Sequence, residues 1–268
     1  MVAIDYGYLS EFLDKIKFSK KMKRIVLIVS ALMAFNLSFS QSIQGKITYQ
    51  ATLDPGTYIR SINNDSIMPQ KRKNSRIKRV VDAVPTNFLL FFNDVESIYH
   101  AENDMYANRK LGLLLNQTGN VGRQDFTYYT NTTTKEKFYQ GFFTSQVLVN
   151  MEKLDWKLTQ ETKKIGKYTC YKATAIVDSE QTSGMNFISP VIAWYTPQIP
   201  VPFGIQTFVG LPGLTLELIA DYENGKIYYQ ATKIELNPEK EIKIKRPKGQ
   251  KKVAENEFVE MLKNMSRR

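Results

Sequence analysis

The sequence has little of the two residue types that most often carry chemistry in protein sites. Its 268 residues include one cysteine, Cys170, and one histidine, His100. One cysteine excludes an intramolecular disulfide framework, and together the two residues cannot supply an ordinary zinc site. Glycine (14) and proline (10) are too few for a collagen-like or low-complexity chain. We therefore expect a folded protein that carries no metal and no cofactor.

Neither residue lies in a recognisable catalytic motif. Cys170 falls within an alternating strand pattern, which predicts a buried thiol with a raised pKa rather than a nucleophile. His100 precedes Glu102 and Asp104, which would offer a metal one nitrogen and two oxygens without rigid spacing, so we predict no metal site there. No Gly-x-Ser-x-Gly sequence and no glycine-rich phosphate loop is present.

A basic segment precedes a short apolar run near the N-terminus. Lys20–Arg24 carries four positive charges, and Ile25–Leu37 contains only two polar residues before Ser38-Phe39-Ser40. This order of a charged region, an apolar region and small residues is typical of a secretory signal peptide. The apolar run is shorter than the roughly 20 residues that a membrane span needs. We predict cleavage near Ser40/Gln41 and a mature chain in the periplasm or at the cell surface, where nucleic acid is not a partner.

The remaining chain divides by composition. Between residues 41 and 237 apolar and polar residues alternate, and beyond that the chain becomes strongly basic. The predicted parts are an upstream extension over 1–21, the signal peptide over 22–40, a β domain over 41–237, and a basic C-terminal tail over 238–268.

The alternating pattern predicts strands joined by tight turns. Ile43–Leu53 alternates and ends at Asp54-Pro55-Gly56, and the 15 tyrosines and 15 phenylalanines suit a sheet. No long stretch within 41–236 has helical periodicity. We predict a mainly β protein with a single antiparallel meander sheet, curved or half-barrel-like. The predicted strands are 43–53, 88–92, 96–99, 126–130, 135–143, 146–151, 157–161, 167–177, 191–196, 214–221 and 226–236.

Two segments fall outside the strand pattern and are predicted to be peripheral. Residues 57–85 are polar and broken, which predicts a mobile loop or a short helix. Ala254–Met265 has apolar residues at helical spacing and predicts an amphipathic helix, which either packs on its own domain or lies on a membrane or a partner. The segments Lys71–Arg79 and Lys240–Arg268 hold much of the net charge of +11 and are compatible with anionic lipid headgroups.

The proline- and glycine-rich segment Trp194–Glu217 is the most unusual part of the sequence. Within it, Gly210-Leu211-Pro212-Gly213 predicts a type II turn, because proline fixes one φ and glycine supplies a positive one. Such a rigid loop either only connects two strands or forms a rim that binds a ligand or partner. The residues of this predicted rim are Trp194, Tyr195, Pro200, Gly210, Leu211, Pro212 and Gly213.

The motif Gly210–Thr215 resembles the one that names the GLPGLI family of secreted proteins from Bacteroidetes-type bacteria, with Thr215 in place of isoleucine. Gly204-Ile205 stands where the family usually carries Gly-Pro. The resemblance covers residues 43–236 and implies an exported protein with no activity or catalytic residues to carry over; family genes near outer-membrane transport systems imply a partner role. Further blocks that resemble the family are Trp156–Ala173, Ala193–Thr196 with Ile199-Pro200, and Phe91–Tyr99.

Three functions are compatible with these observations. The favoured one is a non-enzymatic envelope protein that binds an apolar ligand in the concavity of the sheet, or a protein partner at the rim. The second is an accessory subunit of an outer-membrane transport or assembly complex. The third is a carboxylate-based hydrolase acting on an envelope polymer, with Glu217, Asp221 and Glu223 as candidates. Carboxylates converging in one pocket would favour the hydrolase, and an apolar lining would favour the binding protein.

Overall fold

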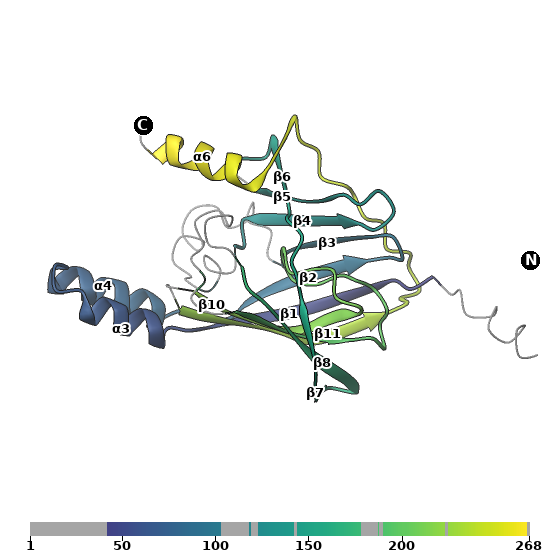
Figure 1. Cartoon of the computed structure of the whole chain (residues 1–268), viewed down its shortest axis with the longest axis horizontal. Coiled ribbons are helices and arrows are strands. Elements are labelled where there is room, and N and C mark those ends of the chain that lie inside the picture. The colour runs from purple at the N-terminus through teal and green to yellow at the C-terminus, as the bar shows by residue number, and fades with distance from the viewer. Residues whose placement is uncertain are drawn as a thin grey trace, which may run out of the picture. The chain divides into compact units, whose positions relative to one another are not determined.

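One twelve-stranded sheet dominates the structure (Figure 1). The computed structural model describes residues 42–102, 118, 123–141, 144–177, 187, 190–222 and 225–266. The predicted extension and signal peptide lie outside the described residues. The chain divides into two units, residues 1–42 and 43–268, and every element described below belongs to the second.

Each strand that the alternating pattern predicts is present. The pattern predicts where a strand lies better than where it ends. Strand β7, for example, continues four residues past its predicted end and stops at a turn that contains Gly166 at φ 55°. The strands are β1 Gly45–Asp54, β2 Thr86–Phe92, β3 Glu96–Ala101, β4 Phe126–Asn131, β5 Lys137–Gly141, β6 Val147–Asn150, β7 Lys157–Ile165, β8 Tyr168–Ala175, β9 Val191–Thr196, β10 Leu214–Tyr222, β11 Gly225–Leu236 and β12 Lys251–Val253.

The sheet consists of two meanders that pair side by side. Its order is β12-β6-β5-β4-β3-β2-β1-β11-β10-β9-β8-β7, so β1 to β6 form one meander and β7 to β11 the other. The two meet where β11 pairs with β1, and the ends β12 and β7 do not pair, so the sheet is open. The prediction of a mainly β protein with one sheet is confirmed. The sheet is mixed rather than wholly antiparallel, because β12 pairs with β6 in parallel.

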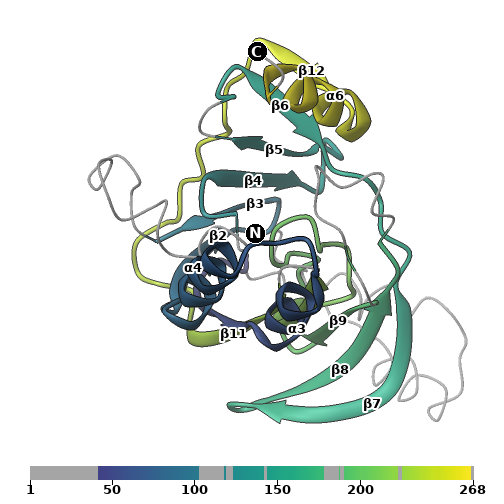
Figure 2. The same ribbon diagram turned by 90° about the vertical axis from the view of Figure 1, so that its left-hand side faces the viewer.

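One face of the sheet, here called the inner face, forms the core. Ile47, Tyr49 and Ala51 alternate along β1 and are fully buried, as are Phe88 and Phe92 on β2. Because cross-strand partners share a face, the same side of the sheet carries a run of aromatic rings from strand to strand. The core cluster joins residues of β5 and β6 to residues of β8, β9 and β10. Both meanders therefore contribute to one core, and Figure 2 shows β7 and β8 as strongly curved ribbons.

A helical hairpin occupies the predicted insertion between β1 and β2. Helix α3 spans Gly56–Asn64 and helix α4 spans Gln70–Val81, so the helix alternative is right and the loop alternative is wrong. Ile62 and Val80 are its buried side chains, one from each helix. Because the flanking strands β1 and β2 pair side by side, the connection between the helices lies at the end away from the sheet (Figure 1).

The C-terminal segment is confirmed as helical, but it is not peripheral. Helix α6 spans Glu255–Ser266, and its Phe258 is only 1% exposed, with its ring 5.9 Å from that of Tyr139 on β5. Before the helix, Ile244 packs on a second small cluster at the outer face of the sheet, which includes Phe138. The segment therefore contacts both faces of the sheet and adds β12 to its edge. Its apolar residues are used inside the domain, which the sequence pattern could not establish.

Candidate functional site

The predicted rim residues divide between the core and the surface. Leu211 and Tyr195 are 1% and 6% exposed, and Gly213 is buried as well. Pro200, Gly210 and Pro212 are exposed, and Trp194 is half-buried beneath the Lys163 ammonium group, which lies 4.4 Å from its ring centre. The seven residues thus do not form one exposed surface, and their role as a binding rim stays a prediction.

The motif Gly210–Thr215 packs against the chain that precedes it instead of forming a type II turn. The Leu214 N–H donates to the Ile199 carbonyl at 3.0 Å, and the φ of Gly213 is 158°, far from the roughly 80° of a type II turn. A Cβ placed on Gly213 would lie 2.3 Å from the Thr196 carbonyl oxygen. Glycine is therefore required here for a close approach between two backbone segments. The type II prediction is wrong because it considered only local sequence.

An earlier part of the same segment covers the inner face. The Phe203 ring lies 6.0 Å from that of Phe92 on β2, and the Gln206 amide donates to the Tyr229 hydroxyl at 2.8 Å. Gln206 has a φ of 55°, a conformation that non-glycine residues seldom adopt. A Cβ on Gly204 would lie 2.3 Å from the Phe208 carbonyl oxygen. These contacts hold residues 203–208 over the sheet and present Thr207 and Phe208 at the edge of a cavity.

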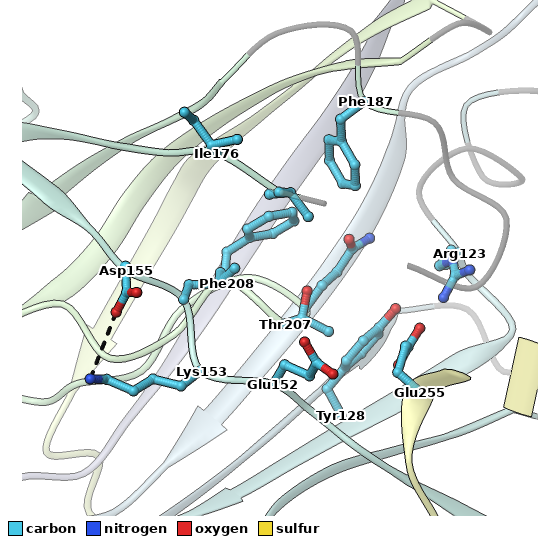
Figure 3. A pocket seen from close by; sticks show the side chains of 13 residues that line it. Arg123, Tyr128, Glu152, Lys153, Asp155, Ile176, Phe187, Thr207, Phe208 and Glu255 are labelled. Carbon is cyan, nitrogen blue, oxygen red and sulfur yellow. Dashed lines mark ion pairs between the residues drawn. The ribbon is translucent and has the colours of Figure 1, made fainter. Parts of the chain in front are cut away.

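That cavity has a volume of about 250 Å³ and an uneven lining (Figure 3). Figure 3 shows Arg123, Tyr128 and Glu255 grouped at one end, with aromatic and aliphatic side chains toward the other. None of the predicted rim residues lines it. The lining residues are Arg123, Tyr128, Glu152, Lys153, Leu154, Asp155, Ile176, Val177, Phe187, Gln206, Thr207, Phe208 and Glu255.

Arg123 sets the electrostatics of the polar end. Burial alone would lower its pKa, but the nearby Tyr128, Tyr139 and Glu255 have the larger combined effect, so the pKa of Arg123 is raised. Its guanidinium group also lies 4.8 Å from the ring centre of Phe126. The pKa of Tyr128 is raised by burial, with Arg123 acting in the opposite direction. At neutral pH this end of the cavity therefore holds a fixed cation beside a neutral phenol.

Glu255 connects the cavity to the C-terminal helix. It stands first in α6, is buried, and accepts a 2.8 Å hydrogen bond from the Tyr139 hydroxyl. A carboxylate at a helix N-terminus is stabilised by the partial positive charge of the unpaired N–H groups. Helix α6 therefore contributes a fixed anion to the cavity wall close to the cation of Arg123.

The opposite end of the cavity has an apolar wall, here called the apolar end, beside the ion pair of Lys153 and Asp155 (Figure 3). The rings of Phe187 and Phe208 meet edge to face at 6.0 Å, and the ring of Phe187 lies 4.5 Å from that of Tyr222. Leu154 and Val177 are half-buried beside them. Ile176, in contrast, is 84% exposed although it lines the same cavity. The apolar end thus continues to the molecular surface at Ile176.

Two buried tyrosines close to the cavity keep unused hydroxyl groups. Among the described residues, no hydrogen-bond partner is found for the Tyr99 or Tyr222 hydroxyl, although both side chains are 2% exposed. Tyr99 contacts the Tyr128 ring at 5.9 Å, and Tyr222 contacts Phe187, so each neighbours a lining residue. Buried polar groups are usually satisfied, so two unused phenols at one cavity are unusual.

Cys170 and His100 do not form a reactive pair. They lie on β8 and β3, six positions apart in the sheet, which is about 29 Å along it at about 4.8 Å per strand. Burial raises the pKa of the Cys170 thiol from 9.0 to about 11, as the strand pattern predicts. The thiol nevertheless pairs in register with Lys163, so the face around it is not wholly apolar. His100 stacks on Phe91, and its Nδ1 lies 2.7 Å from the Ala101 carbonyl oxygen.

Two of the three sequence candidates for carboxylate catalysis, Glu217 and Asp221, are not brought together. Glu217 pairs with Lys163 at 2.5 Å, and Asp221 pairs with Lys226 at 3.3 Å. The two acids are four residues apart on β10, about 13 Å at about 3.3 Å per residue. This exceeds the carboxyl separation of about 5–9.5 Å in glycoside hydrolases. Glu223 lies outside the described residues.

The residues that line the cavity were not found from the sequence. Arg123, Glu152 and Glu255 lie on different segments, and nothing in their local sequence indicates that the fold brings them together. Two local features point weakly to the site. Arg123 is a basic residue in a connection rich in glycine and asparagine, and Glu255 is an acidic residue at the start of a predicted helix. Only the pairing of β12 with β6 carries α6 to the cavity, and three residues are too short a strand for a pattern to reveal.

The described residues offer neither a metal site nor a membrane-spanning helix. Among the described residues, no group of three or more His, Cys, Asp or Glu side chains is arranged to hold a metal ion. None of the described helices has the length and apolar composition that crossing a bilayer requires. The Glu102 carboxylate, which follows His100 by two residues, accepts a hydrogen bond from Asn87 at 2.8 Å. Asp104 lies outside the described residues.

Comparison with protein families gives one match. A family model described as "Protein of unknown function (Porph_ging)" matches residues 156–190 and 185–217. These ranges run from β7 into β10 and contain Trp156, Trp194 and the Gly210–Thr215 motif, so the match falls on blocks that carry the sequence resemblance. Membership of the GLPGLI family itself stays a prediction. A search of curated proteins finds no match.

Comparison with solved structures finds distant likenesses. PNGF-II, in a P21 crystal form, is 19% identical with a TM-score of 0.47, and the match covers 84% of this chain and 33% of that one. A DUF1329 family protein from Desulfovibrio piger is 6% identical with a TM-score of 0.29, over 79% of this chain and 92% of that one. The lipoprotein LppX of Mycobacterium tuberculosis is 9% identical with a TM-score of 0.28, over 82% and 98%. The chain spans about a third of the length of PNGF-II, and none of these likenesses supports an inference about activity.

Proposed function

We propose that the protein is a non-enzymatic binding protein that holds a small, largely apolar ligand with a hydrogen-bonding head group. The observation that carries the proposal is the cavity with Arg123 and Tyr128 at one end and Phe187 and Phe208 at the other. Ligand sites combine apolar walls with placed polar groups, and this lining has both, with five apolar side chains and eight polar or charged ones. The head group would contact Arg123 and Tyr128, and the apolar body would lie against the two phenylalanines.

The size of the cavity limits the ligand. Its volume of about 250 Å³ lies between the roughly 150 Å³ cavity that accommodates benzene and the roughly 300 Å³ at the lower end of drug-sized pockets. A one- or two-ring aromatic, or a short aliphatic chain, fits this range. A longer chain would have to leave past the exposed Ile176.

The head group of the ligand would meet two donors at the polar end. Burial raises the pKa of Tyr128, so its hydroxyl is a neutral donor at neutral pH beside the Arg123 guanidinium group. Donors of this kind suit a carboxylate, sulfonate, ketone or amide head group.

A carboxylate-based hydrolase is the second candidate, and one observation favours it. Glu152, Asp155 and Glu255 line the same cavity, which gives it three acids in addition to its apolar wall, although Asp155 lies 3.7 Å from the Lys153 ammonium group. The contacts of Glu255 favour a structural role, because the acid is buried, accepts a hydrogen bond from Tyr139 and lies near Arg123. If the protein is a hydrolase, Glu152→Gln and Glu255→Gln would each abolish turnover of envelope glycans while ligand retention persists.

Native mass spectrometry of protein purified from the cells that produce it tests the proposal. The expected result is a retained small molecule in a one-to-one complex. Thr207→Trp, which places an indole in the cavity, would remove this mass, whereas Thr133→Trp in the exposed turn after β4 would keep it. A bare protein mass for the wild type after addition of its own envelope extract would overturn the proposal.

The setting in which the ligand is met is part of the same proposal. Export to the periplasm or cell surface rests on the signal-peptide pattern over 22–40, which lies outside the described residues. The role of accessory subunit in an outer-membrane complex likewise rests on the resemblance stated above. N-terminal sequencing of protein from the envelope fraction would test the cleavage near Ser40/Gln41.

A further inference from the structure

The helical hairpin α3–α4 carries a large excess of positive charge. Residues 56–81 contain seven basic side chains and a single acidic one, Asp65, so they supply +6 of the net charge of +11. None of these seven basic residues lines the cavity described above. The hairpin lies between two neighbouring strands and projects beyond them (Figure 1).

Four of these basic residues share one exposed face of α4. Lys71 and Lys78 are seven residues apart, as are Arg72 and Arg79, and seven residues make nearly two helical turns. All four side chains are exposed, and Val80 on the opposite side of the helix is buried. The four define a basic stripe along the solvent side of α4.

Within the part of the chain that the structure describes, carboxylates neutralise the basic stripe less than they neutralise the basic C-terminal segment. No ion pair joins Lys71, Arg72, Lys78 or Arg79 to a carboxylate among the described residues. In the C-terminal segment, by contrast, Arg246 pairs with Glu136 at 2.7 Å and Lys263 with Glu260 at 2.8 Å. As far as the described residues go, the C-terminal segment thus has part of its positive charge compensated by carboxylates, whereas none of the four cations of the basic stripe is in an ion pair.

An apolar residue stands at the end of the hairpin. Ile67, in the connection between α3 and α4, is 92% exposed. Its position is fixed, because the backbone N–H groups of Ile67 and Met68 both donate to the Asp65 carboxylate, at 2.9 and 3.0 Å. The Lys73 ammonium group also donates to the Asn63 carbonyl at 3.0 Å and ties the two helices together. The hairpin therefore holds an isoleucine outward beside a row of cations.

We propose that the α3–α4 hairpin docks on an anionic phospholipid surface, with the basic stripe against the headgroups and Ile67 inserted among them. Basic side chains combined with an exposed aliphatic residue are the features of helices that bind at a membrane surface. An extended stripe matches a plane of many negative charges, whereas a single free phosphate would need converging donors. Charge complementarity therefore favours an anionic phospholipid surface as the partner of the hairpin. This proposal and the proposed ligand binding in the cavity are independent of each other.

Vesicle sedimentation of the full chain tests the proposal with two matched charge variants. One carries Lys71→Gln, Arg72→Gln, Lys78→Gln and Arg79→Gln; the other carries Lys240→Gln, Lys243→Gln, Lys245→Gln and Lys248→Gln at exposed sites of the C-terminal segment. Both remove four positive charges. Wild type should bind phosphatidylglycerol-containing vesicles better than pure phosphatidylcholine, and salt should weaken this binding.

The stripe variant should bind anionic vesicles at least about tenfold more weakly than wild type, because each basic residue near such a surface contributes about 1 kcal/mol. The C-terminal variant should stay within about threefold of wild type, and Ile67→Ser should weaken binding several-fold at unchanged charge. Unfolding midpoints confirm that the variants fold. Equal losses in the two charge variants, or wild-type binding without preference for anionic lipid, would overturn the proposal. Binding to soluble polyglutamate without binding to vesicles would also overturn it.

Discussion

The Tyr49 hydroxyl donates a 2.6 Å hydrogen bond to the Thr215 carbonyl oxygen in the interior of the sheet. Tyr49 lies on β1 and Thr215 near the start of β10, two places away in the sheet order, so the bond links the central strand to the end of the Gly210–Thr215 motif. Tyr99 on β3 is buried to a similar degree, but among the described residues its hydroxyl has no partner.

Tyr49→Phe and Tyr99→Phe should therefore differ in their effect on the free energy of unfolding. Removal of the Tyr49 hydroxyl leaves the Thr215 carbonyl without that donor and should cost about 1–2 kcal/mol. Removal of the Tyr99 hydroxyl leaves no acceptor behind and should be neutral or slightly stabilising. Urea unfolding of the two variants measures the difference. An equal loss in Tyr99→Phe would show that its hydroxyl is satisfied in solution.

Gly213 should tolerate no larger residue. Its Cβ position lies 2.3 Å from the Thr196 carbonyl oxygen, so Gly213→Ala must push two backbone segments apart and should cost about 1–3 kcal/mol or more. Gly56 at the start of α3 is the matched control. A Cβ there meets only side-chain atoms, at 3.2 and 3.6 Å, so Gly56→Ala should be neutral or stabilise by up to about 1 kcal/mol. Thermal unfolding of both variants checks the order, which a harmless Gly213→Ala would contradict.

Phe258 should anchor the C-terminal helix to the sheet. The side chain is fully buried beside Tyr139, so Phe258→Ala should destabilise the protein by about 3–5 kcal/mol. The exposed Ile67 gives the comparison, and Ile67→Ala should change stability by less than about 0.5 kcal/mol. Chemical unfolding followed by tryptophan fluorescence measures both. A small loss for Phe258→Ala would mean that α6 is peripheral after all.

Cys170 should make the protein less stable at alkaline pH. Burial raises its pKa from 9.0 to about 11, so between these values the folded protein keeps a proton that the unfolded chain has lost. This contribution is complete below pH 9 and is lost as the pH rises toward 11. Cys170→Ala should lose less stability over that interval than wild type, as measured by urea midpoints at several pH values. The thiol should also resist alkylation in the native state, and rapid native modification near neutral pH would contradict the burial.

The sequence predicts the strands well because each strand buries one face, and burial leaves a two-residue period that can be read locally. The β1 pattern through Ile47, Tyr49 and Ala51 is an example. The helix α6 is predictable for the same reason, since Phe258 recurs with Met261 and Leu262 at helical spacing. The pattern does not show on which other element each apolar face packs. The packing of α6 against Tyr139, and the parallel strand that precedes it, depend on contacts more than a hundred residues apart.

The candidate site is less predictable than the fold, because its residues come together only through long-range topology. The composition of the Pro/Gly segment marks it as unusual, but the motif within it packs on its own preceding chain. Gly213 lies against Thr196, and the Leu214 N–H donates to the Ile199 carbonyl. The part of the segment that lines the cavity, Gln206 to Phe208, contains no proline or glycine and gave no local signal. Arg123 could be recognised only after the fold placed it beside Tyr128 and Glu255.

Titration with the fluorescent probe 5-(dimethylamino)naphthalene-1-sulfonate tests ligand binding in the cavity most directly. The probe has an apolar two-ring body and a sulfonate head, which match the phenylalanine wall and Arg123. Wild type should bind one probe with enhanced, blue-shifted fluorescence, Thr207→Trp should abolish binding, and Thr133→Trp should leave it unchanged. Saturable binding that is the same in Thr207→Trp and wild type, or no saturable binding in wild type, would contradict the account.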